Sequence, residues 1–195
     1  DGLEQTTRHL RSDIYALVMA NIRSSTHPNI HINFSINAKN VKEIEMLLKT
    51  MEKESNVGGV FFYFHTPYYG KDDLYLPLEE RQKTVKQLLE LKRSGFAVLN
   101  SEGALNAYLS GRWPRPSNVC YTYAQNKLYP CCREYANTET CKECGYLGYL
   151  EVIEINRLSL SAIREGFNYI PRKRIPANAS WFHTSNAQSY CGERE

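Results

Sequence analysis

The sequence predicts an α/β fold built around a parallel sheet, and three observations lead to this prediction. Helical and strand-like patterns alternate in regular order over residues 2–101, and the connections between them are short. Residues 60–64 form a continuous apolar run, as expected for a strand that is buried on both faces. This order is typical of right-handed crossover units, which bring successive strands together in one parallel sheet.

Four segments of the first half carry helical patterns. Apolar residues recur at helical spacing over residues 2–24 and over residues 41–51, where the pattern stops near Gly58 and Gly59. A third helix is predicted over residues 78–94, with Gly95 in the usual C-terminal position. Ser101 opens a further short helix.

Three segments have the pattern of strands. Apolar and polar residues alternate over residues 29–37, and residues 37–40 supply a turn and a helix cap. Residues 60–64 and 96–99 are the second and third predicted strands. Three strands are too few for a closed barrel, so we expect the rest of the sheet to lie upstream of Asp1.

The composition limits the classes of protein to consider. A chain of 195 residues with 42% hydrophobic and 23% charged residues has room for one domain, or for part of one and a small module. The net charge of +3 comes largely from residues 171–174, which argues against nucleic-acid binding. No apolar stretch is long enough to predict a membrane span. Because the first residue is aspartate rather than methionine, we expect the chain to be part of a longer protein.

The pattern divides the chain into three parts. Residues 1–112 form the α/β part, and residues 113–116, which are rich in proline, read as a linker into a cysteine-rich module over residues 113–170. This module ends in a helix predicted over residues 147–165. Residues 171–195 read as a loosely structured tail.

The cysteine-rich module carries the strongest local signal. Its spacing is Cys120-x10-Cys131-Cys132-x8-Cys141-x2-Cys144, in which a Cys-x2-Cys pair can present two thiolates to one metal ion. Four such sulfurs suit zinc and an iron–sulfur cluster equally well. Because Cys131 and Cys132 are adjacent, only one of them is expected to be a ligand. Disulfides in a secreted protein and buried thiols are the alternatives, while the α/β order favours a cytoplasmic enzyme.

A second candidate site lies where the predicted strands end. Asn37 and residues 65–70 follow two strands at their carboxyl ends, the edge at which α/β folds bind their ligands. His65 fits either an acid–base group or an anchor for the loop. Asp72 and Asp73 fit either a carboxylate pair or two solvated side chains.

Several segments, taken in order, resemble the radical S-adenosylmethionine (radical SAM) enzymes. Residues 1–11 are similar to the segment after the fourth barrel strand of that family, where an aspartate–glycine pair leads into a helix. Residues 35–40 resemble the end of the fifth strand, and residues 59–70 resemble the sixth strand with its proline–tyrosine loop. Residues 91–95 and 99–101 match the segments that follow. The cysteine-rich module resembles the shortened auxiliary-cluster modules of the SPASM or twitch type, in which residues 126–131 take the place of a glycine, four residues and a cysteine.

This resemblance implies a fold and an activity. The fold would be the C-terminal half of a partial (β/α)6 TIM-like barrel, followed by the cysteine-rich module. The activity would be reductive cleavage of S-adenosylmethionine by a [4Fe-4S] cluster, giving a 5′-deoxyadenosyl radical that abstracts hydrogen from a small-molecule or peptide substrate. The electron would come from a donor such as flavodoxin or ferredoxin.

The resemblance also implies site residues. Asn37, His65 and Tyr68 would help to bind the cofactor, and Cys120, Cys131, Cys141 and Cys144 would hold an auxiliary cluster. No residue is assigned a catalytic role.

Two departures from the family pattern limit these expectations. The family's Cys-x3-Cys-x2-Cys loop is absent from the sequence and would belong upstream of Asp1, so this chain alone is expected to be an incomplete catalytic unit. Asn126 also replaces the module's glycine, and the spacing from Cys120 is short. The competing hypotheses are an α/β binding module with a structural four-cysteine zinc site and a secreted domain with disulfides.

Overall fold

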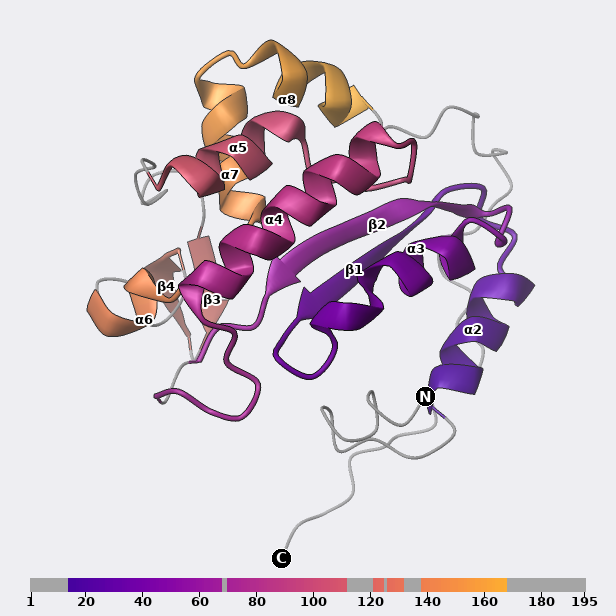
Figure 1. The fold of residues 1–195 in the computed structure, drawn as a ribbon, viewed down its shortest axis with the longest axis horizontal. Coiled ribbons are helices and arrows are strands. Elements are labelled where there is room, and N and C mark those ends of the chain that lie inside the picture. The colour runs from indigo at the N-terminus through magenta and orange to yellow at the C-terminus, as the bar shows by residue number, and fades with distance from the viewer. Residues whose placement is uncertain (1–13, 68–69, 112–120, 125, 132–137, 168–195) are drawn as a thin grey trace, which may run out of the picture.

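The structure, a computed structural model, describes residues 14–67, 70–111, 121–124, 126–131 and 138–167 (Figure 1). The expectations for the start of the first predicted helix, the linker and the tail lie outside these residues. So do those for Tyr68, Cys120 and Cys132. The described part is a mixed α/β structure with one parallel and one antiparallel pair of strands. Within it, the sheet does not close into a barrel.

The first half follows the predicted order of elements. Its helices are α2 (Ile14–Ser24), α3 (Ile44–Met51), α4 (Leu78–Arg93) and α5 (Glu102–Ser110), and the short 3-10 turn η1 (Val41–Glu43) precedes α3. Strands β1 (Ile30–Ile36) and β2 (Val57–Phe64) pair in parallel, so the prediction of a parallel α/β unit is confirmed. Ser101 caps α5 as expected, because its side chain accepts a hydrogen bond from the amide of Ala104 at 3.0 Å.

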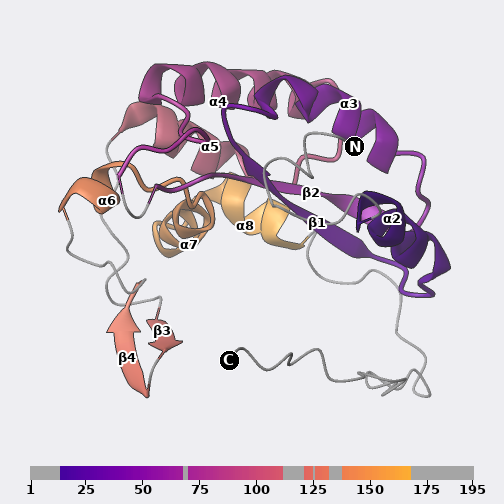
Figure 2. The same cartoon turned by 90° about the horizontal axis from the view of Figure 1, so that it is seen from below.

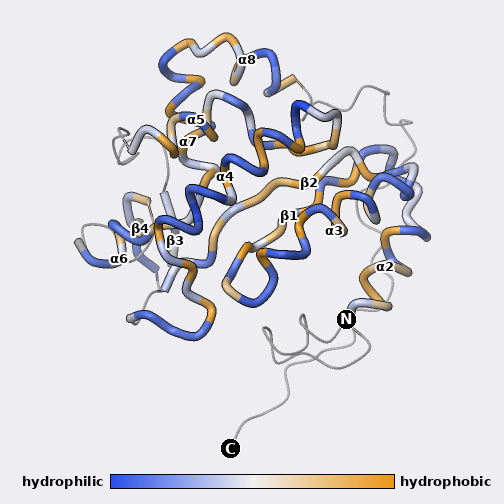
Figure 3. Tube along the Cα trace, viewed as in Figure 1, coloured by the Kyte–Doolittle hydropathy of each residue, from blue (hydrophilic) through white to orange (hydrophobic). Residues whose placement is uncertain are grey.

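The two faces of the β1–β2 pair differ in character. The register pairs Ile32 with Val60, Phe34 with Phe62 and Ile36 with Phe64, so these side chains share one face. Helices α3 and α4 cover that face, and α7 (Gly148–Asn156) and α8 (Leu160–Gly166) lie on the opposite side of the sheet (Figure 2). The core fills the first face, and β2 is predominantly hydrophobic along its length (Figure 3). The second face of β1 instead carries the polar residues His31, Asn33 and Ser35.

The third predicted strand is reduced to one parallel bridge, between Val60 and Val98. The amide of Val60 donates to Ala97 O at 2.8 Å, and the amide of Leu99 donates to Val60 O at 2.9 Å. The buried side chain of Asn100 then takes the place of a strand, since it accepts from Phe62 N at 2.8 Å and donates to Phe62 O at 2.9 Å. Residues 96–99 therefore lie beside β2 as predicted, but a side-chain amide shortens the ladder.

One helix stop and one cap were predicted wrongly. The helix predicted over residues 41–51 does end at Met51, but Gly58 and Gly59, where its pattern was expected to stop, lie inside β2. A Cβ on Gly59 would lie 2.6 Å from Ala97 O, so the glycine allows the close approach of residues 96–99. Asn40 makes no side-chain capping bond. Its Oδ1 instead accepts from Asn37 N within the turn, at 2.8 Å.

The cysteine-rich module contains a hairpin that was not predicted from the sequence, and the helix predicted in it is interrupted. Strands β3 (Tyr121–Ala124) and β4 (Lys127–Pro130) pair antiparallel, followed by α6 (Thr138–Lys142). The helix predicted over residues 147–165 is two helices, α7 and α8, because Leu158 adopts a left-handed conformation with φ 57° between them. Within the described residues, no helix has the length and apolar character needed to cross a bilayer.

Candidate functional site

The carboxyl ends of β1 and β2 lie side by side and bring two predicted site residues together. Ile36 pairs with Phe64, and the amide of His65 donates to Ile36 O at 2.8 Å. Asn37 and His65 therefore leave the sheet at neighbouring positions, at the edge where parallel sheets bind ligands. Tyr68, the third residue of this predicted set, lies outside the described residues.

Asn37 is buried and shapes the turn after β1. Its Oδ1 accepts from Lys39 N at 2.9 Å and from Asn40 N at 3.2 Å. The side chain of Asn40 returns to the strand and donates to Ser35 O at 3.0 Å. Because the turn occupies Oδ1 of Asn37, a contact from this residue to a cofactor would use its Nδ2 group.

His65 forms a close pair with Asp72. Its Nε2 lies 2.8 Å from Asp72 Oδ2, and Asp72 Oδ1 accepts from Leu74 N at 3.0 Å. Burial alone would raise the pKa of Asp72, but the hydrogen bond and charge of His65 and the amides of Leu74 and Tyr75 outweigh it, so the pKa is lowered. Asp72 was predicted either to form a carboxylate pair with Asp73 or to be solvated, and in the structure its partner is instead His65. Asp73 takes no part in this pair.

The turn that carries Cys141 and Cys144 docks on the same edge. Cys144 N donates to Cys141 O at 3.4 Å, which closes the turn after α6. Gly145 then continues alongside β2, because its carbonyl accepts from Phe64 N at 2.7 Å and its amide donates to Thr66 Oγ1 at 3.0 Å. A Cβ on Gly145 would lie 2.2 Å from Phe64 O, so this contact requires glycine.

Arg81 holds this turn to the sheet, and it was not among the site residues predicted from the sequence. Its side chain is 1% exposed, although arginine is seldom buried to that extent. Its guanidinium donates to Leu76 O at 2.7 Å, Glu143 O at 2.8 Å and His65 O at 3.1 Å. An arginine inside the amphipathic pattern of α4, on its apolar side, was the only signal that could have identified it.

Polar and aromatic groups surround the clamp that Arg81 makes. The guanidinium carbon lies 5.5 Å from the ring centroid of Phe64 and 5.3 Å from that of Tyr75. The hydroxyl of Tyr75 donates to Glu143 Oε2 at 2.9 Å. Burial raises the pKa of Tyr108, and the charge and hydrogen bond of Arg81 oppose this rise only in part. The cysteine turn is thus tied to α4 and to the loop before it, as well as to β2.

Of the four predicted metal ligands, the structure brings two onto one turn. Cys141 and Cys144 are partly exposed, whereas Cys131 is buried at the end of β4 with φ 68°, and its carbonyl accepts a hydrogen bond from Thr122. In the described part of the chain, no group of three or more potential metal-ligating side chains is gathered. The donor chemistry and spacing of the Cys141–Cys144 pair fit half of a four-sulfur shell, and Cys120 lies outside the described residues.

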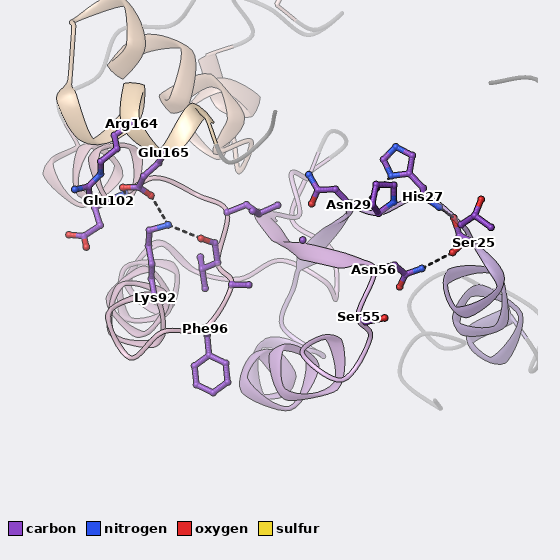
Figure 4. A pocket seen from close by; sticks show the side chains of 16 residues that line it. Ser25, His27, Asn29, Ser55, Asn56, Lys92, Phe96, Glu102, Arg164 and Glu165 are labelled. Atoms are coloured by element: carbon purple, nitrogen blue, oxygen red, sulfur yellow. Dashed lines mark hydrogen bonds and ion pairs between the residues drawn. The ribbon is translucent and has the colours of Figure 1, made fainter. Parts of the chain in front are cut away.

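A cavity of about 940 Å³ lies at the opposite end of the sheet (Figure 4). Residues from the loops before β1 and β2 line it, together with the segment after α4 and the end of α8. Lys92 spans one side, donating to Val98 O at 2.7 Å and pairing with Glu165 at 2.6 Å. None of the predicted site residues lines this cavity, so the predicted site and the cavity are separate.

Comparison with known proteins gives no relative: no family model matches the chain, and neither a curated protein nor a solved structure matches it significantly.

Proposed function

We propose that this chain is the C-terminal part of a radical SAM enzyme, in which Cys120, Cys131, Cys141 and Cys144 hold an auxiliary iron–sulfur cluster. In this proposal, β1 and β2 are the last two strands of a partial (β/α)6 barrel, and residues 96–99 lie beside β2 after them. The bound [4Fe-4S] cluster and S-adenosylmethionine would supply the reductive cleavage that forms the 5′-deoxyadenosyl radical. Electrons would come from a flavodoxin or ferredoxin, and the substrate would be a small molecule or a peptide.

The observation that carries the proposal is the docking of the cysteine turn. The pair Cys141 and Cys144 lies at the carboxyl edge of the parallel sheet, beside the ends of the strands that carry Asn37 and His65. A module that only stabilised its own fold could sit anywhere on the surface. Attachment at the edge where α/β sheets bind their ligands would place an accessory redox centre near a bound substrate.

The character of the sheet's second face agrees with this proposal. A parallel strand buried on both faces is expected to be apolar throughout, but β1 carries His31, Asn33 and Ser35 on one face. On β2 the same face carries Phe61, opposite Asn33, and Tyr63, opposite Ser35. The ring of Tyr63 lies 6.0 Å from that of Tyr146, two residues after Cys144. The polar side chains of β1, with an aromatic contact from β2 to the cysteine turn, support a site on this face.

A structural zinc site is the second candidate. A Cys-x2-Cys turn that follows a two-stranded hairpin suits zinc as well as iron and sulfide, and in that case the cysteines would only stabilise the fold. The two candidates differ in whether sulfide is bound.

The test is anaerobic purification and reconstitution of the whole chain with iron and sulfide, followed by metal analysis and absorption spectroscopy. We expect several irons per chain and a broad absorption band at about 400 nm. The double variant Cys141→Ser, Cys144→Ser should lose both signals. The matched control Cys191→Ser, outside the proposed ligand set, should keep them. Equal iron in the double variant and the wild type would refute the assignment of these ligands.

A further inference from the structure

The strongest pair of titratable side chains at the sheet edge is His65 and Asp72. His65 is the first residue after β2, and two hydrogen bonds hold its backbone. Its amide donates to Ile36 O, and its carbonyl accepts from the guanidinium of Arg81. Its side chain is 25% exposed, so the ring reaches solvent while its backbone is held in place. This combination of a rigid backbone and an accessible imidazole is suited to proton exchange.

Asp72 determines which nitrogen of the His65 ring carries the proton. The carboxylate accepts a hydrogen bond at 2.8 Å from Nε2 of His65, so in the neutral ring the proton is on Nε2 and the lone pair is on Nδ1. The other oxygen of Asp72 accepts from Leu74 N, and Leu74 O in turn accepts from Ala38 N at 3.1 Å, next to Asn37. The loops that follow both strands therefore hold Asp72 in position.

We propose that His65 is a proton-exchanging residue of this site and that Asp72 is its positioning residue. The inference rests on the proposed function, because it takes the sheet edge to be where a substrate binds. In the forward step, Nδ1 accepts a proton from an O–H or N–H group of the substrate, whose bonding electrons stay on the oxygen or nitrogen. The imidazolium keeps its Nε2–H hydrogen-bonded to Asp72, and Nδ1 returns the added proton in the reverse step.

Few other charged groups face this pair among the described residues. Lys71 and Asp73 flank Asp72 in the loop, and Lys71 lies 3.9 Å from Glu143. From α4, Arg81 contacts the carbonyl of His65 rather than its ring. The charge directly opposite the imidazole is therefore that of Asp72.

Acylation by diethyl pyrocarbonate, which requires an unprotonated and accessible imidazole nitrogen, tests this inference without a known substrate. The rate at His65 is followed by peptide mass spectrometry between pH 5.5 and 8.5 in the whole chain, in Asp72→Asn and in the matched control Asp73→Asn. We expect His65 to react in the wild type. Asp72→Asn should lower the plateau of the rate profile by about threefold or more, because the carboxylate orients the ring through its contact with Nε2. Asp73→Asn should leave the profile unchanged.

The results separate failure of this inference from failure of the proposed function. An unreactive His65, an Asp72→Asn profile that superimposes on the wild type, or an equal effect of Asp73→Asn would each overturn the inference. Iron and sulfide are counted on the same samples, and Asp72→Asn should keep the wild-type amounts. A chain that binds no iron but shows the expected profiles would refute the cluster while leaving the pair intact.

Discussion

The carbonyl of Gly145 accepts a hydrogen bond from the amide of Phe64 at 2.7 Å, so the cysteine turn extends the hydrogen bonding of β2 beyond the sheet. Residues 81 positions apart in the chain are joined by this bond, which links the cysteine-rich half to the parallel strands. The contact fixes where Cys144 can lie relative to His65.

Gly145→Ala tests the contact directly. Its new methyl group would meet Phe64 O, and the overlap should destabilise the fold by about 1–3 kcal/mol. Urea denaturation followed by circular dichroism measures the change. Gly166→Ala is the control, since a Cβ there meets no atom within 4 Å, and it should change stability by less than about 0.5 kcal/mol. Equal effects of the two variants would contradict the docking of the turn.

Arg81→Lys tests the clamp between α4, the end of β2 and the cysteine turn. A lysine cannot reproduce the three hydrogen bonds to Leu76, His65 and Glu143, so we expect a loss of at least about 2 kcal/mol. The control is Arg93→Lys on the same helix, where the exposed arginine pairs with Glu102 and the change should stay within about 0.5 kcal/mol. Thermal unfolding of both variants gives the comparison, and an Arg81→Lys protein as stable as its control would show that the clamp is not needed.

Because Lys92 forms a buried ion pair with Glu165, replacing Lys92 should lower the stability of the fold much more than replacing the adjacent Arg93. Their charged atoms are 2.6 Å apart, and the side chains are 16% and 8% exposed. Lys92→Met leaves the Glu165 carboxylate buried without its partner and should cost about 3–5 kcal/mol. Arg93→Met breaks an exposed pair and should cost about 1 kcal/mol or less. Chemical denaturation that gave the same loss for both would contradict the buried pairing of α8 with α4.

Glu151 predicts a dependence of stability on pH. Burial raises the pKa of this carboxyl above its ordinary value of 4.5, although the amide and hydroxyl of Ser101 oppose the shift. A raised folded pKa favours the folded state below the unfolded pKa, and that contribution is lost as pH rises through the folded value. Glu151→Gln, which can still accept from Ser101 N, should therefore be more stable than wild type at pH 7–8.

The stability advantage of Glu151→Gln over wild type should also depend on pH. It should shrink as the pH falls towards 4.5, which the urea midpoints of both proteins measure across the range. Glu90→Gln on the exposed face of α4 serves as the control and should show no such trend. An advantage for Glu151→Gln that grew as pH fell would contradict the buried state of this carboxyl.

Local patterns predicted the parallel unit well, because its signals lie within single elements. Alternation over β1, the apolar run of β2 and Ser101 as a helix cap each depend on neighbours in the sequence. The ends of these elements were harder to predict, since they depend on distant partners. Gly59 lies inside β2, opposite His31, and is a glycine because residues 96–99 approach it closely. Asn100 replaces a strand position through its side chain.

The candidate site was predicted in its parts rather than in its assembly. Residue types and strand ends identified Asn37, His65 and the cysteines. The pairing of His65 with Asp72 and the clamp by Arg81 arise from contacts between residues 7 and 62 positions apart in the chain, which no local pattern contains. Arg81 has no separate motif, and its buried position shows only in the folded chain.

Acid-labile sulfide per chain, measured after the whole protein is offered iron, sulfide and zinc together under anaerobic conditions, tests the central claim most directly. An auxiliary [4Fe-4S] cluster predicts about four sulfides with iron in equal amount and little zinc. One zinc per chain with no sulfide would contradict the cluster and leave a structural four-cysteine zinc site in its place.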